Sequence, residues 1–367
     1  MNTLRIFLIG AGHIARSHSQ TAQKLAKMEN LDLELHVADP IEAARTSFGE
    51  KFPEAKLYAD SSAMLSVPAQ EGDIAIIATP PFLHRAGAVA ALNSGRDTLV
   101  EKPLTPTLRE AEEILEAAHR NGKLFGDCSM RLHNMVSTRE LRQRILDGEI
   151  GDLYHVRHVY KGGWGRPGIE YQPASKWFMD KSKAGGGILV DWGVYDLANL
   201  TFLLRPTKVE VRHAWWARPQ TPADPTEDVF DVETHAGATM IWHTESGAKV
   251  TVDYERASGT HGKAQSLSEV EGTRGAFEWS WAWDWKASGT KRAYHEGKTA
   301  EQELSFVDED EQKWEINQGE RPLIAFFQAT RGRDVPALTN EAALFNFRIL
   351  MALFQAAETG EAVTVEK

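Results

Sequence analysis

The sequence predicts an α/β dinucleotide-binding domain followed by a domain built on a large open, mostly antiparallel sheet. Three observations predict this. Short apolar runs alternate with helical stretches over the first 130 or so residues, a glycine-rich turn joins the first run to the first helix, and strands predominate from residue 207 on. We expect a Rossmann domain over residues 1–128 and a second domain over residues 129–367.

Composition narrows the class of protein. The 367 residues suffice for two domains, and 42% apolar with 25% charged residues is typical of soluble globular chains. A net charge of −11 without a basic run disfavours nucleic acid and anionic membranes as partners. Cys128 is the only cysteine, and we see neither a secretory signal nor an apolar run of membrane-spanning length, so a cytoplasmic location is expected.

A glycine-rich motif follows the first predicted strand, residues 4–9. It reads G-x-G-x-x-A and opens a helix that runs to about residue 28. Gly10 permits the tight turn, Gly12 lets a pyrophosphate approach the backbone, and Ala15 allows close helix packing. The helix N-terminus offers N–H groups to phosphates. A glycine turn without a function explains the motif alone equally well. The cofactor-binding residues predicted here are Gly10, Gly12, His13, Ile14 and Ala15.

An acidic residue ends the second predicted strand, residues 33–38. The Asp39 carboxylate is placed to accept hydrogen bonds from the adenosine ribose and to repel a 2′-phosphate, which favours NAD over NADP. The alternative is a solvated loop aspartate. Arg45, six residues further on, could pair with a 2′-phosphate and weaken the preference for NAD.

The next long apolar strand, residues 74–78, leads into Thr79-Pro80. Ligands of a doubly wound sheet bind at the C-terminal ends of its strands, so we expect Thr79 and Pro80 at the cofactor wall. His84 lies in the first turn of the following helix, residues 82–93. Its side chain faces either the cofactor or solvent.

The strand over residues 97–100 ends in Glu101-Lys102-Pro103, close to the end of the first domain. We expect Glu101 and Lys102 beside the cofactor, with Lys102 where the cofactor meets the substrate. The remaining predicted elements of this domain are a short strand near 56–58, a helix over 107–121 and a strand over 124–126.

The second domain begins with a helix over 134–147 and an alternating strand over 153–160. A loop over 161–184 follows, rich in glycine and proline, and it contains Trp164 and Trp177. A loop of this length inside a compact domain is usually functional.

Three glycines at 185–187 precede Asp191 and Tyr195. These two residues are four apart, so a helix extending to about residue 204 places them on one face. The glycines allow the start of this helix to approach another group closely.

These motifs together resemble the glucose–fructose oxidoreductase / inositol dehydrogenase / MocA family, from residue 4 to the C-terminus. The resemblance implies an NAD-dependent oxidoreductase acting on a sugar, a polyol or a sugar derivative. In the family a catalytic aspartate is commonly followed four residues later by histidine. Tyr195 stands at that position here, as in the glucose–fructose oxidoreductase and dihydrodiol dehydrogenase branches. Phe178 stands where the family often has arginine.

Oxidation of a secondary alcohol by NAD requires a hydride acceptor, a base and a group that holds the oxygen. We assign Lys102 to orient and polarise the oxygen and Tyr195 to accept the proton, because a nearby ammonium favours phenolate. Asp191 would hydrogen-bond the substrate or Lys102. Lys102 and Tyr195 could exchange the acid/base role, and an ion pair or a buried phenol without a catalytic role is the structural alternative.

The predicted ligands follow from these assignments. Aromatic faces near Asp191 suit the apolar faces of pyranose rings, and Trp177 joins the predicted cofactor site. No metal site is predicted. The alternatives are an NAD-dependent glycosidase that uses transient oxidation and elimination, and a non-catalytic sugar or nucleotide sensor. The substrate-binding residues predicted are Lys102, Arg131, Trp164, Asp191, Trp192 and Tyr195.

The C-terminal half reads as an antiparallel sheet, with predicted strands over 208–216, 232–243, 249–256, 266–271 and 276–283. Alternation in the last strand predicts a stripe formed by Trp279, Trp281, Trp283 and Trp285. A face covered by helices or by another subunit is favoured over a sugar-stacking platform. The resemblance implies an open sheet that is often used for oligomerisation, so we expect a homodimer or homotetramer formed through this sheet. Helices over 321–332 and 340–359 and a strand over 362–365 end the chain, and the resemblance implies that these last helices pack back on the sheet.

Overall fold

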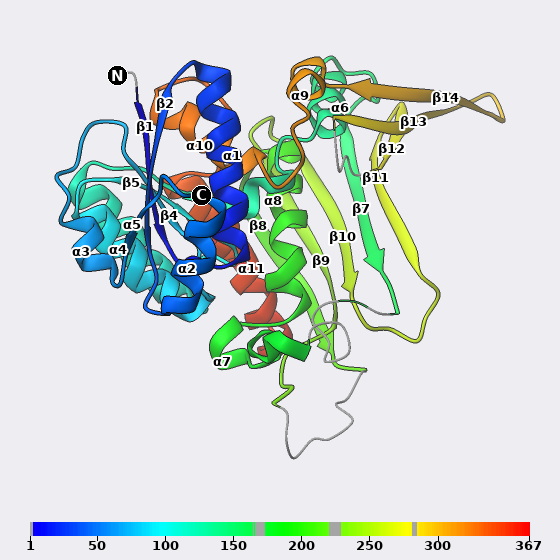
Figure 1. Cartoon of the computed structure of the whole chain (residues 1–367). Helices are drawn as coiled ribbons and strands as arrows, with labels where there is room; N and C mark the ends of the chain where they lie inside the picture. The colour runs from blue at the N-terminus through cyan, green and yellow to red at the C-terminus, as the bar shows by residue number, and fades with distance from the viewer. Residues whose placement is uncertain (1–2, 164, 166–172, 220–228, 281–284) are drawn as a thin grey trace. The chain divides into compact units, whose positions relative to one another are not determined.

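The computed structural model describes the chain except residues 1–2, 164, 166–172, 220–228 and 281–284 (Figure 1). It divides into two compact units. The first contains Met1–Arg131 and Gly319–Leu344, and the second contains Leu132–Gln318 and Phe345–Lys367.

The first unit is built on a six-stranded parallel sheet. Its strand order is β3-β2-β1-β4-β5-β6, so the order reverses between β1 and β4. This is the doubly wound arrangement that the sequence predicts, and the prediction of a Rossmann domain is confirmed. Its strands are β1 (Thr3–Ile9), β2 (Asp32–Ala38), β3 (Lys56–Tyr58), β4 (Ile74–Ile77), β5 (Asp97–Val100) and β6 (Phe125–Asp127).

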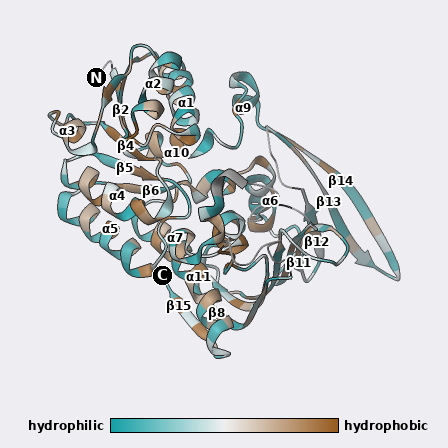
Figure 2. Ribbon diagram, turned by 60° about the horizontal axis from the view of Figure 1, so that its bottom comes forward, coloured by the Kyte–Doolittle hydropathy of each residue, from teal (hydrophilic) through white to brown (hydrophobic). Residues whose placement is uncertain are grey.

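Most helices of this unit connect its strands, whereas the last one returns from the end of the chain. Figure 2 shows hydrophobic residues along β4 and β5 and hydrophilic residues on the outer side of α5. The α5 helix begins where the Thr107 hydroxyl accepts the Glu110 backbone N–H, and it ends at Gly122 in the left-handed conformation. The sequence analysis missed α2 and α3. The helices are α1 (His13–Glu29), α2 (Glu42–Lys51), α3 (Ser61–Leu65), α4 (His84–Asn93), α5 (Leu108–Asn121) and α10 (Arg321–Thr330).

The segment Gly319–Leu344 groups with the first unit, whereas the sequence analysis places it in the second domain. Its helix α10 packs on α1, where Lys24 contacts the Glu320 carboxylate at 2.8 Å and Arg333 contacts Glu29 at 2.9 Å. Long-range contacts of this kind leave no local pattern in the sequence.

The second unit is built on a nine-stranded sheet of order β14-β13-β12-β11-β7-β10-β9-β8-β15. Among the described strands, β7 and β10 alone pair in parallel, so the predicted open, mostly antiparallel sheet is confirmed. The strands are β7 (Leu153–Lys161), β8 (Pro206–Ala217), β9 (His235–Thr244), β10 (Lys249–Ala257), β11 (Gln265–Gly272), β12 (Gly275–Trp279), β13 (Lys286–His295), β14 (Lys298–Val307) and β15 (Val363–Glu366).

Helices α8 and α11 lie along one face of this sheet (Figure 1). The stretch Lys181–Leu204 is long and apolar enough to cross a membrane, but 89% of its apolar window is buried, as in a core helix. The other helices of the unit are short or peripheral. The helices are α6 (Val136–Leu146), α7 (Lys181–Ala184), α8 (Val194–Leu204), α9 (Glu309–Trp314) and α11 (Asn340–Thr359), which begins in the first unit.

The structure describes two of the four tryptophans in the predicted stripe. Strand β12 ends at Trp279, which is buried, and Trp285 precedes the separate strand β13. Trp281 and Trp283 lie outside the described residues.

Candidate active site

The first unit forms a cradle where β1 meets α1. Gly10 has a φ of +107°, and a Cβ added there would lie 2.6 Å from the Ala78 carbonyl oxygen, so only glycine fits. Gly12 precedes α1 without a capping side chain, and nothing lies within 4 Å of the position its Cβ would take. The N–H groups of the first turn, which includes His13, are thus open to a phosphate ligand.

Asp39 lies next to this cradle, at the end of β2. Its carboxylate accepts the backbone N–H of Ala11 at 2.9 Å and that of Ile41 at 2.8 Å. Each carboxylate oxygen has a second lone pair, so ribose hydroxyls can still be accepted. Arg45 donates to the Asp39 carbonyl oxygen at 2.7 Å, which places both predicted adenosine-site residues together.

Exposed apolar side chains follow three strands at the same edge of this sheet as the cradle. They belong to the segments that follow β1, β2 and β4, and β1 and β4 flank the point where the strand order reverses. This edge fits a dinucleotide, whose phosphates would meet the α1 N-terminus and whose rings would meet apolar surface. The side chains and their exposed fractions are Ile14 37%, Ile41 63%, Phe82 43% and Leu83 45%.

Thr79 and Pro80, predicted at the cofactor wall, follow β4 and are half-buried. His84 differs from both expected orientations because it is fully buried. Its Nε2 lies 2.7 Å from the Thr79 carbonyl oxygen, and its Nδ1 lies 2.9 Å from the Pro103 carbonyl oxygen. The His84 ring therefore joins the two loops that follow β4 and β5.

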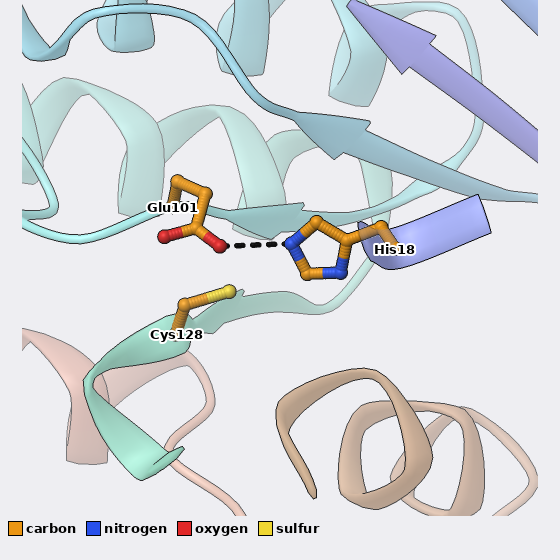
Figure 3. Close-up of side chains that lie close together, drawn as sticks. All are labelled: His18, Glu101 and Cys128. Atoms are coloured by element: carbon orange, nitrogen blue, oxygen red, sulfur yellow. Dashed lines mark hydrogen bonds and ion pairs between the residues drawn. The ribbon is translucent and has the colours of Figure 1, made fainter. Parts of the chain in front are cut away.

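Glu101 follows β5, and its carboxylate is turned into the first unit (Figure 3). One oxygen lies 2.8 Å from Nε2 of His18 on α1, and the other accepts the Lys102 backbone N–H at 3.1 Å. Burial raises the pKa of Glu101, but the hydrogen bond from His18 and neighbouring positive charges outweigh burial and hold this pKa well below its usual range. Glu101 is therefore a buried carboxylate.

Cys128 completes this cluster with His18 and Glu101, whose potential ligand atoms lie within 4.8 Å of one another. Burial raises the pKa of the Cys128 thiol well above its usual value, and the charge of the neighbouring Glu101 adds to this rise. Metal ligands must be deprotonated, whereas this thiol keeps its proton, and the Glu101 carboxylate is already held by His18 and the Lys102 N–H. The chemistry of the cluster favours a hydrogen-bonded core over a metal centre.

Lys102 comes next in the chain and is half-buried. It follows β5, the neighbour of β4 in the sheet, so it stands one strand from the wall formed by Thr79. Arg131 is also half-buried, in the turn after β6, and its charge contributes to lowering the pKa of Glu101. The first unit thus brings its predicted cofactor residues and Lys102 to one edge of the sheet.

Asp191 and Tyr195 lie on one helical stretch of the second unit. Asp191 is in a π-helical turn, Leu189–Gly193, and Tyr195 is in the first turn of α8. Both side chains are buried, at 3% and 1% exposure, and the Trp192 and Tyr195 ring centroids are 5.9 Å apart. Single π-helical turns occur frequently at functional sites.

Glu233, which the sequence analysis does not assign, holds the start of this stretch. Its carboxylate accepts the Gly187 N–H at 2.8 Å and the Leu189 N–H at 3.0 Å. A Cβ on Gly187 would lie 1.8 Å from the Glu233 carbonyl oxygen, which explains the need for glycine there. Burial raises the pKa of Glu233 to about 7, against the effect of its N–H donors. An acidic residue near the start of the predicted strand 232–243 was the available signal.

Asp196 follows Tyr195 in the sequence, and its carboxylate is bound by other side chains of the second unit. It is fully buried, accepts the Tyr254 hydroxyl at 2.8 Å, and lies 3.5 Å from Arg256. The Arg256 guanidinium lies 5.4 Å from the Trp192 ring centroid. These contacts assign Asp196 to the support of the stretch.

The structure describes one of the two tryptophans in the predicted loop. Trp177 lies in a 3₁₀ helix, Pro173–Met179, where its ring stacks on Phe178 with centroids 3.7 Å apart. The predicted loop over 161–184 therefore contains helical turns. Trp164 lies outside the described residues.

Two family models match the chain. One, described as an oxidoreductase family with an NAD-binding Rossmann fold, matches residues 4–126, and the GFO/IDH/MocA C-terminal domain matches residues 138–278. The 1,5-anhydro-D-fructose reductase of Ensifer adhaerens is 27% identical over 80% of this chain and 80% of that protein. The trans-1,2-dihydrobenzene-1,2-diol dehydrogenase of Bos taurus is 26% identical over 72% of this chain and 74% of that protein.

Solved structures show the same fold. A levoglucosan dehydrogenase in complex with NADH and levoglucosan covers 100% of both chains with a TM-score of 0.78 and 20% identity. An aldose–aldose oxidoreductase from Caulobacter crescentus, complexed with glycerol, has a TM-score of 0.72 and 21% identity over 99% of this chain and 100% of that chain. At these identities the likeness concerns the fold alone.

Proposed function

The chain belongs to the GFO/IDH/MocA oxidoreductase family, whose N-terminal domain is an NAD-binding Rossmann fold, and we propose that it oxidises or reduces a sugar, a polyol or a sugar derivative. A hydride passes between the nicotinamide and a secondary alcohol or ketone carbon. The observation that carries this proposal is the position of Lys102, one strand from the wall of a cradle that fits NAD. The relatives named for anhydrofructose and dihydrodiol support a neutral polyhydroxylated substrate.

The roles of the side chains follow from the chemistry of alcohol oxidation. The nicotinamide supplies the hydride acceptor. Lys102 orients the reacting oxygen and stabilises negative charge on it, and Tyr195 accepts the hydroxyl proton in oxidation and returns it in reduction. Asp191 hydrogen-bonds the substrate and fixes its position. The buried helical stretch that carries Asp191 and Tyr195 supports this assignment, because fixed side chains lose little freedom when substrate binds.

A screen of pyranoses, inositols and glycosides with NAD, followed by NADH absorbance, tests the function. We expect NADH to form with at least one class of neutral sugar or polyol. Release of an aglycone from glycosides without net NADH would instead indicate the glycosidase. Binding of sugars without any turnover would indicate a sensor.

Replacing Asp39 by asparagine is expected to shift the cofactor preference. The asparagine amide keeps the shape of the side chain and one oxygen that accepts a loop N–H. It lacks the negative charge of the carboxylate, which binds ribose hydroxyls and repels a 2′-phosphate. We expect the kcat/KM ratio of NAD to NADP to fall by about tenfold, since hydrogen bonds to charged groups contribute about 1.5–3 kcal/mol. Asp60→Asn, at the exposed start of α3, is the control. An unchanged ratio in Asp39→Asn would remove Asp39 from the adenosine site.

We also propose that the second unit forms a homodimer or homotetramer through its sheet. Among the described residues of that unit, a hollow of about 310 Å³ lies on the sheet and is lined by His155, Arg157, Trp215 and Asp253, among others. Trp215 is 38% exposed, which suits burial in a contact between copies of this chain. Light scattering should give the mass of two or four chains. A single-chain mass at micromolar concentration would contradict the proposal.

We propose that the protein is located in the cytoplasm. The sole cysteine, Cys128, is buried and reduced, which suits a compartment that does not form disulfides. Fractionation of the source cells should recover the protein with cytoplasmic markers, and recovery with periplasmic or secreted proteins would contradict this proposal.

A further inference from the structure

The segment between Glu101 and Leu104 carries Lys102 out of β5, and both of its ends are held by buried groups. At its start, the Glu101 backbone N–H donates to the Ile77 carbonyl oxygen of β4 at 3.1 Å. The Glu101 carboxylate then accepts the Lys102 N–H, so the backbone on both sides of Glu101 is fixed.

His18 holds this carboxylate from α1. The His18 ring is 3% exposed and Glu101 is 6% exposed, so water cannot easily replace their 2.8 Å contact. A buried carboxylate that loses a hydrogen-bond donor pays a full desolvation cost. Loss of the His18 ring is therefore expected to turn Glu101 away from its position and to release the Lys102 N–H.

His84 holds the other end of the segment from α4. Its Nδ1 faces the Pro103 and Leu104 carbonyl oxygens, at 2.9 and 3.2 Å, and its Nε2 faces the Thr79 carbonyl oxygen at 2.7 Å. Carbonyl oxygens only accept hydrogen bonds, and a neutral ring carries one N–H, so the ring donates on one side and lies in contact with the carbonyl oxygens on the other. A single fully buried ring thus packs between the cofactor wall and the loop that carries Lys102.

We propose that His18 and His84 are positioning residues that together set the conformation of residues 101–104, and thereby the direction of the Lys102 side chain. Neither histidine needs to touch cofactor or substrate. His84 also links Thr79 to the Lys102 loop, so its loss affects cofactor binding as well as turnover, whereas loss of His18 affects mainly turnover. The inference rests on the proposed function where it concerns turnover.

The test uses His84→Phe and His18→Phe, which keep a ring but remove the donors, with His84→Gln and His18→Gln as variants that restore one donor. We expect His84→Phe to lower kcat about tenfold and to raise the KM for NAD about fivefold, because small displacements of a reacting group cost large factors in rate. His18→Phe should lower kcat with little change in the KM for NAD. Each glutamine variant should recover part of the loss.

The matched control is His36→Phe. His36 is another buried histidine of the first unit, on β2, where it stacks on Phe7 and contacts Tyr58 and Glu34. This variant also removes a buried imidazole. Its strand, β2, is separated by β1 and β4 from β5, the strand that leads into the Lys102 loop. We expect its kinetic constants to remain within about twofold of wild type, whatever its Tm.

A second readout does not depend on activity. The acetylation rate of Lys102 by acetic anhydride, followed by mass spectrometry of its peptide, reports the environment of the amine. We expect this rate to change about threefold or more in His84→Phe and His18→Phe and to stay unchanged in His36→Phe. An unchanged rate in folded His84→Phe and His18→Phe, or in His84→Leu and His18→Leu if the phenylalanine variants do not fold, overturns the inference. An equal change of the Lys102 acetylation rate in His36→Phe also overturns the inference. A wild-type enzyme without turnover would refute the proposed function, and the acetylation rates would still decide the inference.

Discussion

Lys102→Ala is expected to lose most turnover while NAD binding stays nearly intact. The lysine stands beside the proposed cofactor site but makes no part of the glycine cradle or the Asp39 contacts. Removing a group that stabilises charge on the reacting oxygen typically lowers kcat by a hundredfold or more, so we expect a fall of about that size. Steady-state kinetics with the substrate found in the screen, and NADH binding by calorimetry, measure the two effects separately.

Two further substitutions sharpen this experiment. Lys102→Met keeps the length of the side chain but removes the charge, and should lose as much activity as alanine. Lys123→Ala, at a half-buried lysine just after α5, should stay within about twofold of wild type. Activity of Lys102→Ala within a few-fold of wild type would remove Lys102 from the chemistry.

Tyr195→Phe has the second large expected effect. The phenylalanine ring retains the packing against Trp192, whose ring centroid lies 5.9 Å away, and removes only the hydroxyl. If Tyr195 is the proton acceptor, kcat for oxidation should fall by about a hundredfold, the usual contribution of general acid–base catalysis. The rise of kcat/KM with pH that a base produces should also disappear. pH profiles of the wild type and the variant measure both effects.

Tyr254→Phe is the matched control for Tyr195→Phe. The Tyr254 hydroxyl donates to the buried Asp196 carboxylate, so its loss should lower the free energy of unfolding by about 1–3 kcal/mol. The pH profile should keep its shape. A pH profile that is unchanged in Tyr195→Phe, or flattened equally in Tyr254→Phe, would contradict the role given to Tyr195.

The parallel sheet was predictable because its strands are short, apolar and followed by recognisable turns. The run before Gly10 and the run before Thr79 are both completely or almost completely buried, which makes their sequences nearly continuous in apolar residues. Strands β13 and β14 were missed for the opposite reason. Most of their residues are polar and partly exposed, and the turn at Glu296-Gly297, with two positive φ angles, was the one local signal.

The candidate site was predictable only where a side chain acts next to its own motif. Asp39 follows its strand, and its position beside Gly10 and Ala11 results from the pairing of β1 with β2. The supporting groups depend on tertiary contacts. His18 and Glu101 are 83 residues apart in the sequence, and Glu233 is 46 residues from the Gly187 N–H that it accepts. No periodicity or spacing rule reports contacts of this kind.

Direct transfer of hydrogen between carbon and the nicotinamide is tested most directly by isotope transfer. A substrate deuterated at the carbon that carries the reacting hydroxyl is incubated with NAD and the wild-type protein, and the NADH is analysed by mass spectrometry. The proposed function predicts NADH that carries the deuterium, formed at a rate that falls in Lys102→Ala and Tyr195→Phe. NADH without deuterium, or consumption of the substrate without transfer of its label to the nicotinamide, would contradict it.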